Sequence, residues 1–230
     1  MFGTGLFGER DQPADARAIA VVHDALRRDL LRTRITLTTD DGPTPERRPR
    51  VAAHLVWMLD VVLAHHERRR ADLYDTMRAA SPATAAVLDD LAEDLDRIRP
   101  QIADLCAAAR RWSATGSATE RAGLVDALDV LTTALLPHLD REDQELPRAL
   151  AASLTHRQWR RWNRTHSSLP TTAEEWNWAI DSIEAGRRQL VLNLVPVAVR
   201  LVGVEVMGNG YRRRAAARWD VSPAACGAPV

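Results

Sequence analysis

Residues 137–147 read PHLDREDQELP, and this short stretch decides which fold to expect. It places His138 and Glu142 four residues apart between two prolines. In an α-helix this spacing puts both side chains on one face, and nearby leucines share or flank that face. The pair has two explanations: a chance arrangement on a solvated surface, or two ligands that point into a helical bundle. The rest of the chain has to distinguish them.

The composition is that of a globular protein with one substantial domain, with or without an appendage. The chain has 230 residues, of which 46% are hydrophobic and 27% are charged. The formal net charge is +0, so electrostatic attraction does not favour nucleic acid as a partner. The cysteines Cys106 and Cys226 are too few for a disulfide framework or a thiolate metal site, and this fits a reducing cytoplasm.

Neither a secretory signal nor a membrane span is expected. The N-terminus lacks a basic segment followed by an apolar run. The most apolar stretch, residues 190–207, is interrupted by charged residues, an asparagine and a proline, whereas a spanning helix needs about 20 largely apolar residues. We therefore predict a cytoplasmic protein. The basic C-terminal stretch YRRRAAARW, residues 211–219, could make weak contact with an anionic membrane surface.

Apolar residues recur at helical spacing through most of the chain, as in AIAVVHDALRRDLLR from Ala18. No segment alternates with a period of two. The sequence therefore predicts an all-α, up-down four-helix bundle over residues 15–150, after a flexible N-terminus at 1–14. We expect Pro100 to kink or divide the third helix, and Pro137 and Pro147 to bend or end the fourth. The predicted helices cover about 15–36, 51–79, 83–112 and 119–150.

Residues 151–230 are predicted to form a helical extension packed on the bundle. Short helices are expected to begin near Thr155 and at TTAEEW, residues 171–176, and a glycine-rich break precedes the basic C-terminal helix. Four tryptophans between 159 and 178 could stack on nucleic-acid bases, but adjacent acidic residues and the neutral net charge oppose this. We expect them to pack the extension against the bundle.

Histidines in three of the predicted bundle helices indicate a metal site. A single histidine on an apolar stripe is more often a hydrogen-bonded core residue than a ligand. Here His23 lies in the first helix, His65 and His66 in the second, and His138 with Glu142 in the fourth. Side chains from facing helices converge on a metal inside a bundle, and imidazole with carboxylate suits iron, manganese or zinc.

Three stretches resemble the hemerythrin-like family, the bundle proteins with an HHE cation-binding domain. They are VVHDALRRDLLR (21–32), LAHHERRRADLYDTM (63–77) and HLDREDQELPRALAASLTHRQW (138–159), and the resemblance extends over about residues 15–165. It implies a non-haem iron site for oxygen or redox chemistry or for sensing. The implied ligands are His23, His65 or His66, His138 and Glu142.

The second stretch departs from the family pattern. The family places a bridging glutamate four residues after a histidine, but here Arg69 follows His65 and Arg70 follows His66 at that spacing. Glu67 could replace the glutamate only if the helix turns differently. The third predicted helix also lacks the expected histidine. The retained residues could hold one metal ion, in a mononuclear or an incomplete di-iron site.

The arginines leave two other hypotheses open. An inward Arg69 or Arg70 would place a positive charge at the metal position and form a salt bridge with Glu142 instead. A metal-free ligand-binding or biosynthetic enzyme could then use His23, His138 and Glu142 for acid–base chemistry around an apolar cavity. The other hypothesis is a structural or sensory module without chemistry. The expected partner is a small molecule or oxygen.

Overall fold

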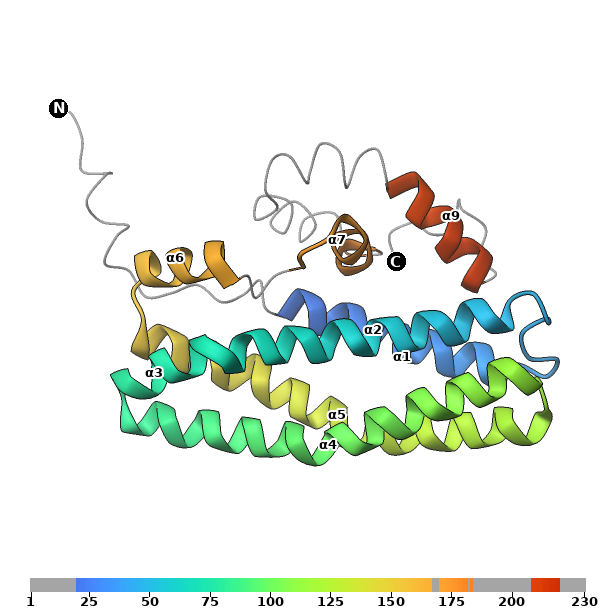
Figure 1. Cartoon of the computed structure of the whole chain (residues 1–230), viewed down its shortest axis with the longest axis horizontal. Helices are drawn as coiled ribbons and strands as arrows, with labels where there is room; N and C mark the ends of the chain where they lie inside the picture. Colours follow the sequence, from blue (N-terminus) through green and yellow to red (C-terminus); the bar gives the residue numbers. More distant parts are fainter. Residues whose placement is uncertain (1–19, 167–169, 182, 184–207, 220–230) are drawn as a thin grey trace.

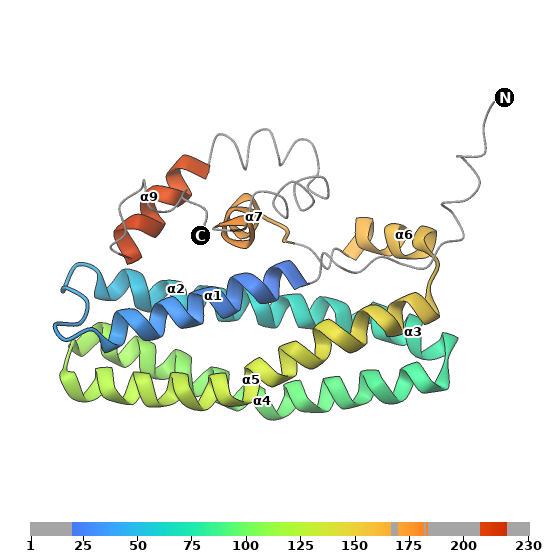
Figure 2. The same cartoon turned by 180° about the vertical axis from the view of Figure 1, so that it is seen from behind.

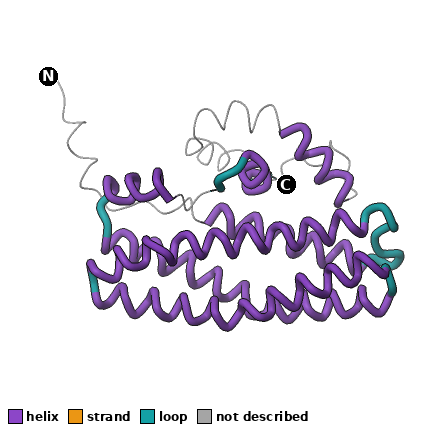
Figure 3. Tube along the Cα trace, in the orientation of Figure 1, coloured by secondary structure: helices purple, strands orange, loops and turns teal. Residues whose placement is uncertain are grey.

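The computed structural model describes residues 20–166, 170–181, 183 and 208–219, and every regular element in these ranges is a helix (Figure 3). The four longest helices lie side by side along the long axis of the molecule, and consecutive ones run in opposite directions (Figures 1 and 2). The predicted all-α bundle is therefore confirmed. The predicted N-terminal segment 1–14 and the apolar stretch 190–207 lie outside the described residues. The long helices are α1 (Ala20–Thr38), α2 (Arg48–Arg68), α4 (Pro82–Thr115) and α5 (Ala118–Ser153).

Local sequence signals set the ends of the two longest helices. The hydroxyl of Ser81 caps α4 by accepting a hydrogen bond from the amide of Thr84 at 3.4 Å. Ser117 caps α5 in the same way. Between the helices, Gly116 has a φ of +65°, a left-handed conformation that strains residues with a side chain. This turn lets α4 and α5 lie antiparallel against each other.

The prolines inside the bundle neither divide nor end the helices. Helix α4 continues through Pro100, and α5 continues through Pro137 and Pro147. Each proline removes one backbone donor, but Pro100 and Pro137 are exposed, so water can bind the carbonyl that loses its partner. Of the two outcomes predicted for Pro100, a kinked or a divided third helix, the division was wrong.

The second bundle helix changes its hydrogen-bond pattern after residue 68. The single helix predicted over 51–79 consists of α2, a π-helical segment η1 (Arg69–Leu73) and α3 (Tyr74–Ala80). In η1 the amide of Tyr74 donates to the carbonyl of Arg69, five residues earlier. Such wide turns inside helices often occur at functional sites. This one begins three residues after His66, the second of two adjacent histidines.

Two apolar clusters fill the bundle. The larger contains side chains of all four long helices, and the smaller surrounds α3 and the last turns of α5. Along α5, Leu139 belongs to the larger cluster and Leu146 to the smaller, and Glu142 lies between them. A charged group at this depth is far from bulk water and therefore needs protein or metal partners.

Helix α5 also has the length and composition of a membrane-spanning segment. Core helices of bundles meet the same criterion. Because α5 packs against α1 and α4 and carries a buried carboxylate, we interpret it as a core helix.

Three further helices lie on the side of the bundle formed by α1 and α2 (Figures 1 and 2). Thr155 begins α6 as predicted, because its hydroxyl accepts from the amide of Gln158 at 3.3 Å. The predicted glycine-rich break was wrong, since Gly208 and Gly210 are part of the last helix, where glycine is unfavourable but tolerated. The three helices are α6 (His156–His166), α7 (Ala173–Ile180) and α9 (Gly208–Trp219).

Two tryptophans pack α6 and α7 against the bundle. Trp159 of α6 is buried in the smaller apolar cluster, and Trp178 of α7 is fully buried in the larger one. The ring of Trp178 meets that of Trp57 on α2 edge to face, with centroids 5.4 Å apart. Aromatic contacts of this kind add to the burial of apolar area.

A buried carboxylate also joins the extension to the bundle. Oδ2 of Asp29, on α1, accepts from Nε2 of His54 at 2.7 Å and from Nε1 of Trp178 at 3.0 Å. Oδ1 accepts from Nε of Arg28 at 2.9 Å and from Arg32 at 3.2 Å. Burial would raise the pKa of Asp29, but the hydrogen bond from His54 and the charge of Arg28 outweigh it and hold this pKa far below its ordinary value. Asp29 is therefore an ionised carboxylate at the point where α7 meets α1 and α2.

Candidate metal centre

The polar residues predicted on three helices lie together inside the bundle. His23 comes from α1, His65 and His66 from the end of α2, and His138 and Glu142 from α5. All of these side chains are buried, and Glu142 is only 1% exposed. The chance surface pair considered for His138 and Glu142 is therefore excluded. Both members face the core.

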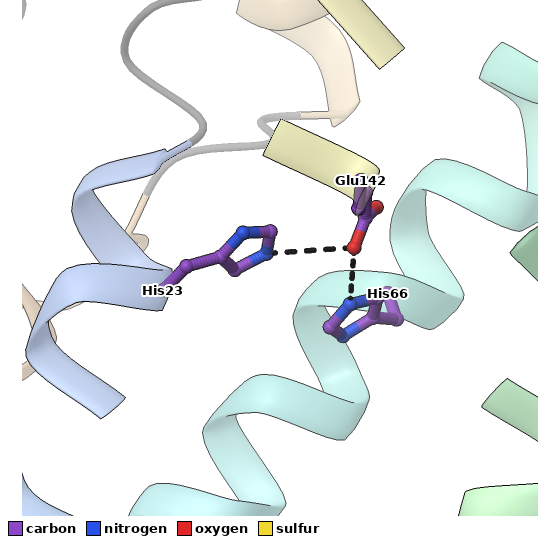
Figure 4. Close-up of side chains that lie close together, drawn as sticks. All are labelled: His23, His66 and Glu142. Atoms are coloured by element: carbon purple, nitrogen blue, oxygen red, sulfur yellow. Dashed lines mark hydrogen bonds and ion pairs between the residues drawn. The ribbon is translucent and has the colours of Figure 1, made fainter. Parts of the chain in front are cut away.

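One oxygen of Glu142 faces imidazole nitrogens from three helices. Its Oε2 lies 2.9 Å from Nε2 of His66, 3.6 Å from Nε2 of His23 and 3.7 Å from Nε2 of His138. Figure 4 shows the first two contacts. His23, His66 and Glu142 each offer a ligand atom, and these atoms lie within 4.8 Å of one another. The spacing would allow one ion to contact all three residues.

The second nitrogen of two histidines shows which tautomer they adopt. Nδ1 of His66 lies 2.8 Å from the carbonyl oxygen of Val62, which can only accept, so Nδ1 carries a hydrogen. Nδ1 of His23 lies 2.6 Å from Oδ1 of Asp143 and donates to this carboxylate. The Nε2 atoms of both rings face Glu142. Metal-binding histidines are commonly oriented in this way, because the hydrogen bond from one nitrogen to a carboxylate or backbone carbonyl fixes the ring and directs the other nitrogen to the ion.

His65 and His138 add further buried nitrogens to the cluster. Among the described residues, neither nitrogen of either ring has a hydrogen-bond partner, and the same holds for Nε2 of His23. Buried polar groups are normally paired, so orphaned imidazole nitrogens around one carboxylate indicate ligands for an ion. Imidazoles with a single carboxylate suit iron, manganese or zinc. The cluster could therefore hold a metal ion.

The protonation states also suit a metal. Burial lowers the pKa of His23, places that of His65 well below its ordinary value and lowers that of His138 to about 4. Burial would raise the pKa of Glu142, but the charge of Arg69 is the largest of the effects that outweigh it and hold this pKa well below its usual range. At neutral pH these three imidazoles are neutral and the carboxylate is ionised, as metal ligands must be.

The lowered histidine pKa values predict that the metal-free protein loses stability as the pH falls below about 6.5. In the unfolded chain a histidine takes up a proton near this pH, whereas buried His23, His65 and His138 do so only at lower pH. The unfolded state then binds more protons, so the unfolding free energy decreases by about 1.4 kcal/mol per pH unit for each such histidine. Urea unfolding with a chelator between pH 7.5 and 5 measures this slope, and an unfolding free energy that stays constant over this window would contradict the prediction.

Arg69 is the feature that departs from an ordinary metal site. Its side chain is fully buried, and Nη2 lies 2.6 Å from Oε1 of Glu142. The two groups are not aligned as a hydrogen bond, so the contact is a charge pair. Arg70 points away from the core and pairs with Asp96 at 2.7 Å at the surface. Of the two arginines predicted as alternative partners of Glu142, Arg69 is therefore the one that reaches it and Arg70 is not, because adjacent helical residues point in different directions.

Glu67 is not a ligand, and that alternative was wrong as well. Its side chain is exposed and pairs with Arg99 on α4. A residue directly after His66 lies about 100° around the helix from it, which here directs Glu67 to solvent.

Two carboxylates at the edge of the cluster, Asp143 and Asp94, were not among the predicted site residues. Asp143 orients His23, and it is adjacent to Glu142 in the opening motif. Asp94 on α4 places Oδ2 3.8 Å from Nδ1 of His138 and also pairs with Arg141. Both are among many acidic residues in their helices, and only contacts between helices single them out.

A helical bundle that buries a cluster of histidines and a carboxylate is typical of the class of cation-binding bundle proteins. The model of the hemerythrin HHE cation-binding domain matches residues 15–150. The chain therefore belongs to the hemerythrin HHE family. Comparisons with the curated proteins and with the solved structures find no significant match.

Proposed function

We propose that the protein binds non-haem iron through His23, His66, His138 and Glu142 and uses it for oxygen or redox chemistry or for sensing. The observation that carries this proposal is the convergence of three imidazole Nε2 atoms, from His66, His23 and His138, on Oε2 of Glu142 at 2.9, 3.6 and 3.7 Å. A cation among these atoms would contact the carboxylate and several imidazole nitrogens at once. The orphaned nitrogens of the neighbouring histidines favour the cation.

The chain itself contributes orientation, charge and shielding from water. Asp143 holds the ring of His23, and the Val62 carbonyl holds that of His66. Tyr74 lies near Glu142, and burial raises its pKa, so it remains a neutral phenol beside the cluster. The apolar clusters on both sides keep the layer dry, which strengthens each electrostatic contact. When bound, iron in a histidine-rich site with one carboxylate supplies oxygen binding and one-electron redox chemistry.

The acid–base hypothesis finds less support. A groove of about 470 Å³ lies between α2 and α4, lined by small apolar residues with Trp57, Asp60 and Arg110. Its lining contains none of the clustered histidines, nor Glu142. The groove therefore does not supply the apolar cavity that acid–base chemistry at the cluster would require.

Metal content of protein purified without a histidine tag tests the proposal. After anaerobic incubation with Fe(II) and removal of the excess, the wild type is expected to retain iron. The variants His66→Asn and His23→Asn are expected to lose it, because each removes a clustered nitrogen. His156→Asn, on α6 and outside the cluster, is the matched control and is expected to retain iron. A wild-type protein that holds no iron, manganese or zinc would defeat the proposal.

A further inference from the structure

The two oxygens of Glu142 have different partners. Oε2 faces His66, His23 and His138, whereas Oε1 lies 2.6 Å from Nη2 of Arg69. A carboxylate that bridges two cations uses one oxygen for each. Here one oxygen faces the proposed metal ligands, and the other already faces a cation that belongs to the chain.

Arg69 is a permanent charge at that position. A guanidinium stays protonated in proteins, and this one is fully buried. Among the described residues its nitrogens find no hydrogen-bond acceptor, so its short charge pair with Glu142 is the contact that compensates its burial. Burying an arginine without a partner is strongly unfavourable. The guanidinium is therefore held against Oε1 and is not free to turn to solvent.

The place of Arg69 along the chain is equally specific. It stands one helical turn after His65, whose two nitrogens have no partner among the described residues. The π-helical segment starts at Arg69, while Arg70 points outward. A second ion near His65 and Oε1 would meet the guanidinium within a few ångström, and repulsion between the two cations would oppose its binding.

We propose that Arg69 takes the place of a second metal ion, neutralises Oε1 of Glu142 and restricts the centre to a single ion. This inference rests on the proposed function, because it needs a metal on the Oε2 side. Arg69 then determines that the centre binds one ion and not two.

Titration with Mn(II) under anaerobic conditions, followed by calorimetry and by metal analysis after gel filtration, tests the stoichiometry. The wild type is expected to bind one ion per chain. Arg69→Glu is expected to bind two, because it removes the cation and adds a carboxylate beside His65 and Oε1. Arg70→Glu makes the same charge change one residue later, at the surface, and is expected to bind one.

A second variant covers the case in which Arg69→Glu does not fold. Arg69→Met keeps most of the side-chain volume and removes the charge, and it is expected to bind the first ion about tenfold more tightly or better. Arg70→Met is expected to leave that affinity unchanged. Two ions in the wild type, one ion in a folded Arg69→Glu protein, or an unchanged affinity in Arg69→Met would each overturn the inference. A wild type that binds no ion would instead remove the proposed function, and the inference with it.

Discussion

Replacing Glu142 with alanine is expected to destabilise the metal-free protein by about 3–5 kcal/mol, the range found when one partner of a buried ion pair is removed. The variant leaves Arg69 fully buried without its carboxylate, in a layer closed by apolar clusters. It also removes the acceptor beside His66. The same substitution is expected to abolish metal binding, since Glu142 is the carboxylate that faces the clustered nitrogens.

Urea unfolding with a chelator, together with metal analysis, measures both effects. The control is the double variant Glu142→Ala with Arg69→Met, which removes both charges. It is expected to recover much of the lost stability, because an apolar pair can replace a buried ion pair. It is not expected to recover metal binding. A Glu142→Ala protein as stable as the wild type would show that the charge pair does not hold Arg69 in the core.

The second large effect is expected at Asp29. Asp29→Asn should destabilise the protein by about 3 kcal/mol or more, because two arginines lose a buried counter-charge and the amide nitrogen faces donors. The four donors to Asp29 come from α1, α2 and α7, so its loss should loosen the extension before the bundle unfolds. Trp178 loses a hydrogen-bond acceptor, so a change in tryptophan fluorescence at low urea should precede the loss of helix.

Asp129→Asn is the matched control for Asp29→Asn. Asp129 pairs with Arg34 at 2.7 Å on the bundle surface, where both side chains are about half exposed. Exposed ion pairs contribute about 0.2–1 kcal/mol, so this variant should unfold nearly as the wild type does. Equal effects of the two substitutions, or a single cooperative transition in Asp29→Asn by both probes, would contradict the role given to Asp29.

The helical periodicity of the chain determined the bundle, and it determined which faces are buried. His23 stands on the apolar stripe of one helix and His138 with Glu142 on that of another, and in the structure all three are buried together. This was predictable because the spacing of side chains along a helix is a local property. The capping serines, such as Ser81, are local signals as well. The family resemblance followed from the same stretches and is confirmed over residues 15–150.

Only the tertiary structure decided how the residues of the site are paired. His23 meets Asp143 across 120 residues of sequence, and His54 meets Asp29 across 25. Periodicity also left open which of two neighbouring arginines turns inward. Arg69 is the one that turns inward. It is the first residue of a π-helical segment, and its partner Glu142 lies on another helix. A buried charge has to find its partner in three dimensions, and that partner comes from a distant segment that spacing along one helix cannot identify.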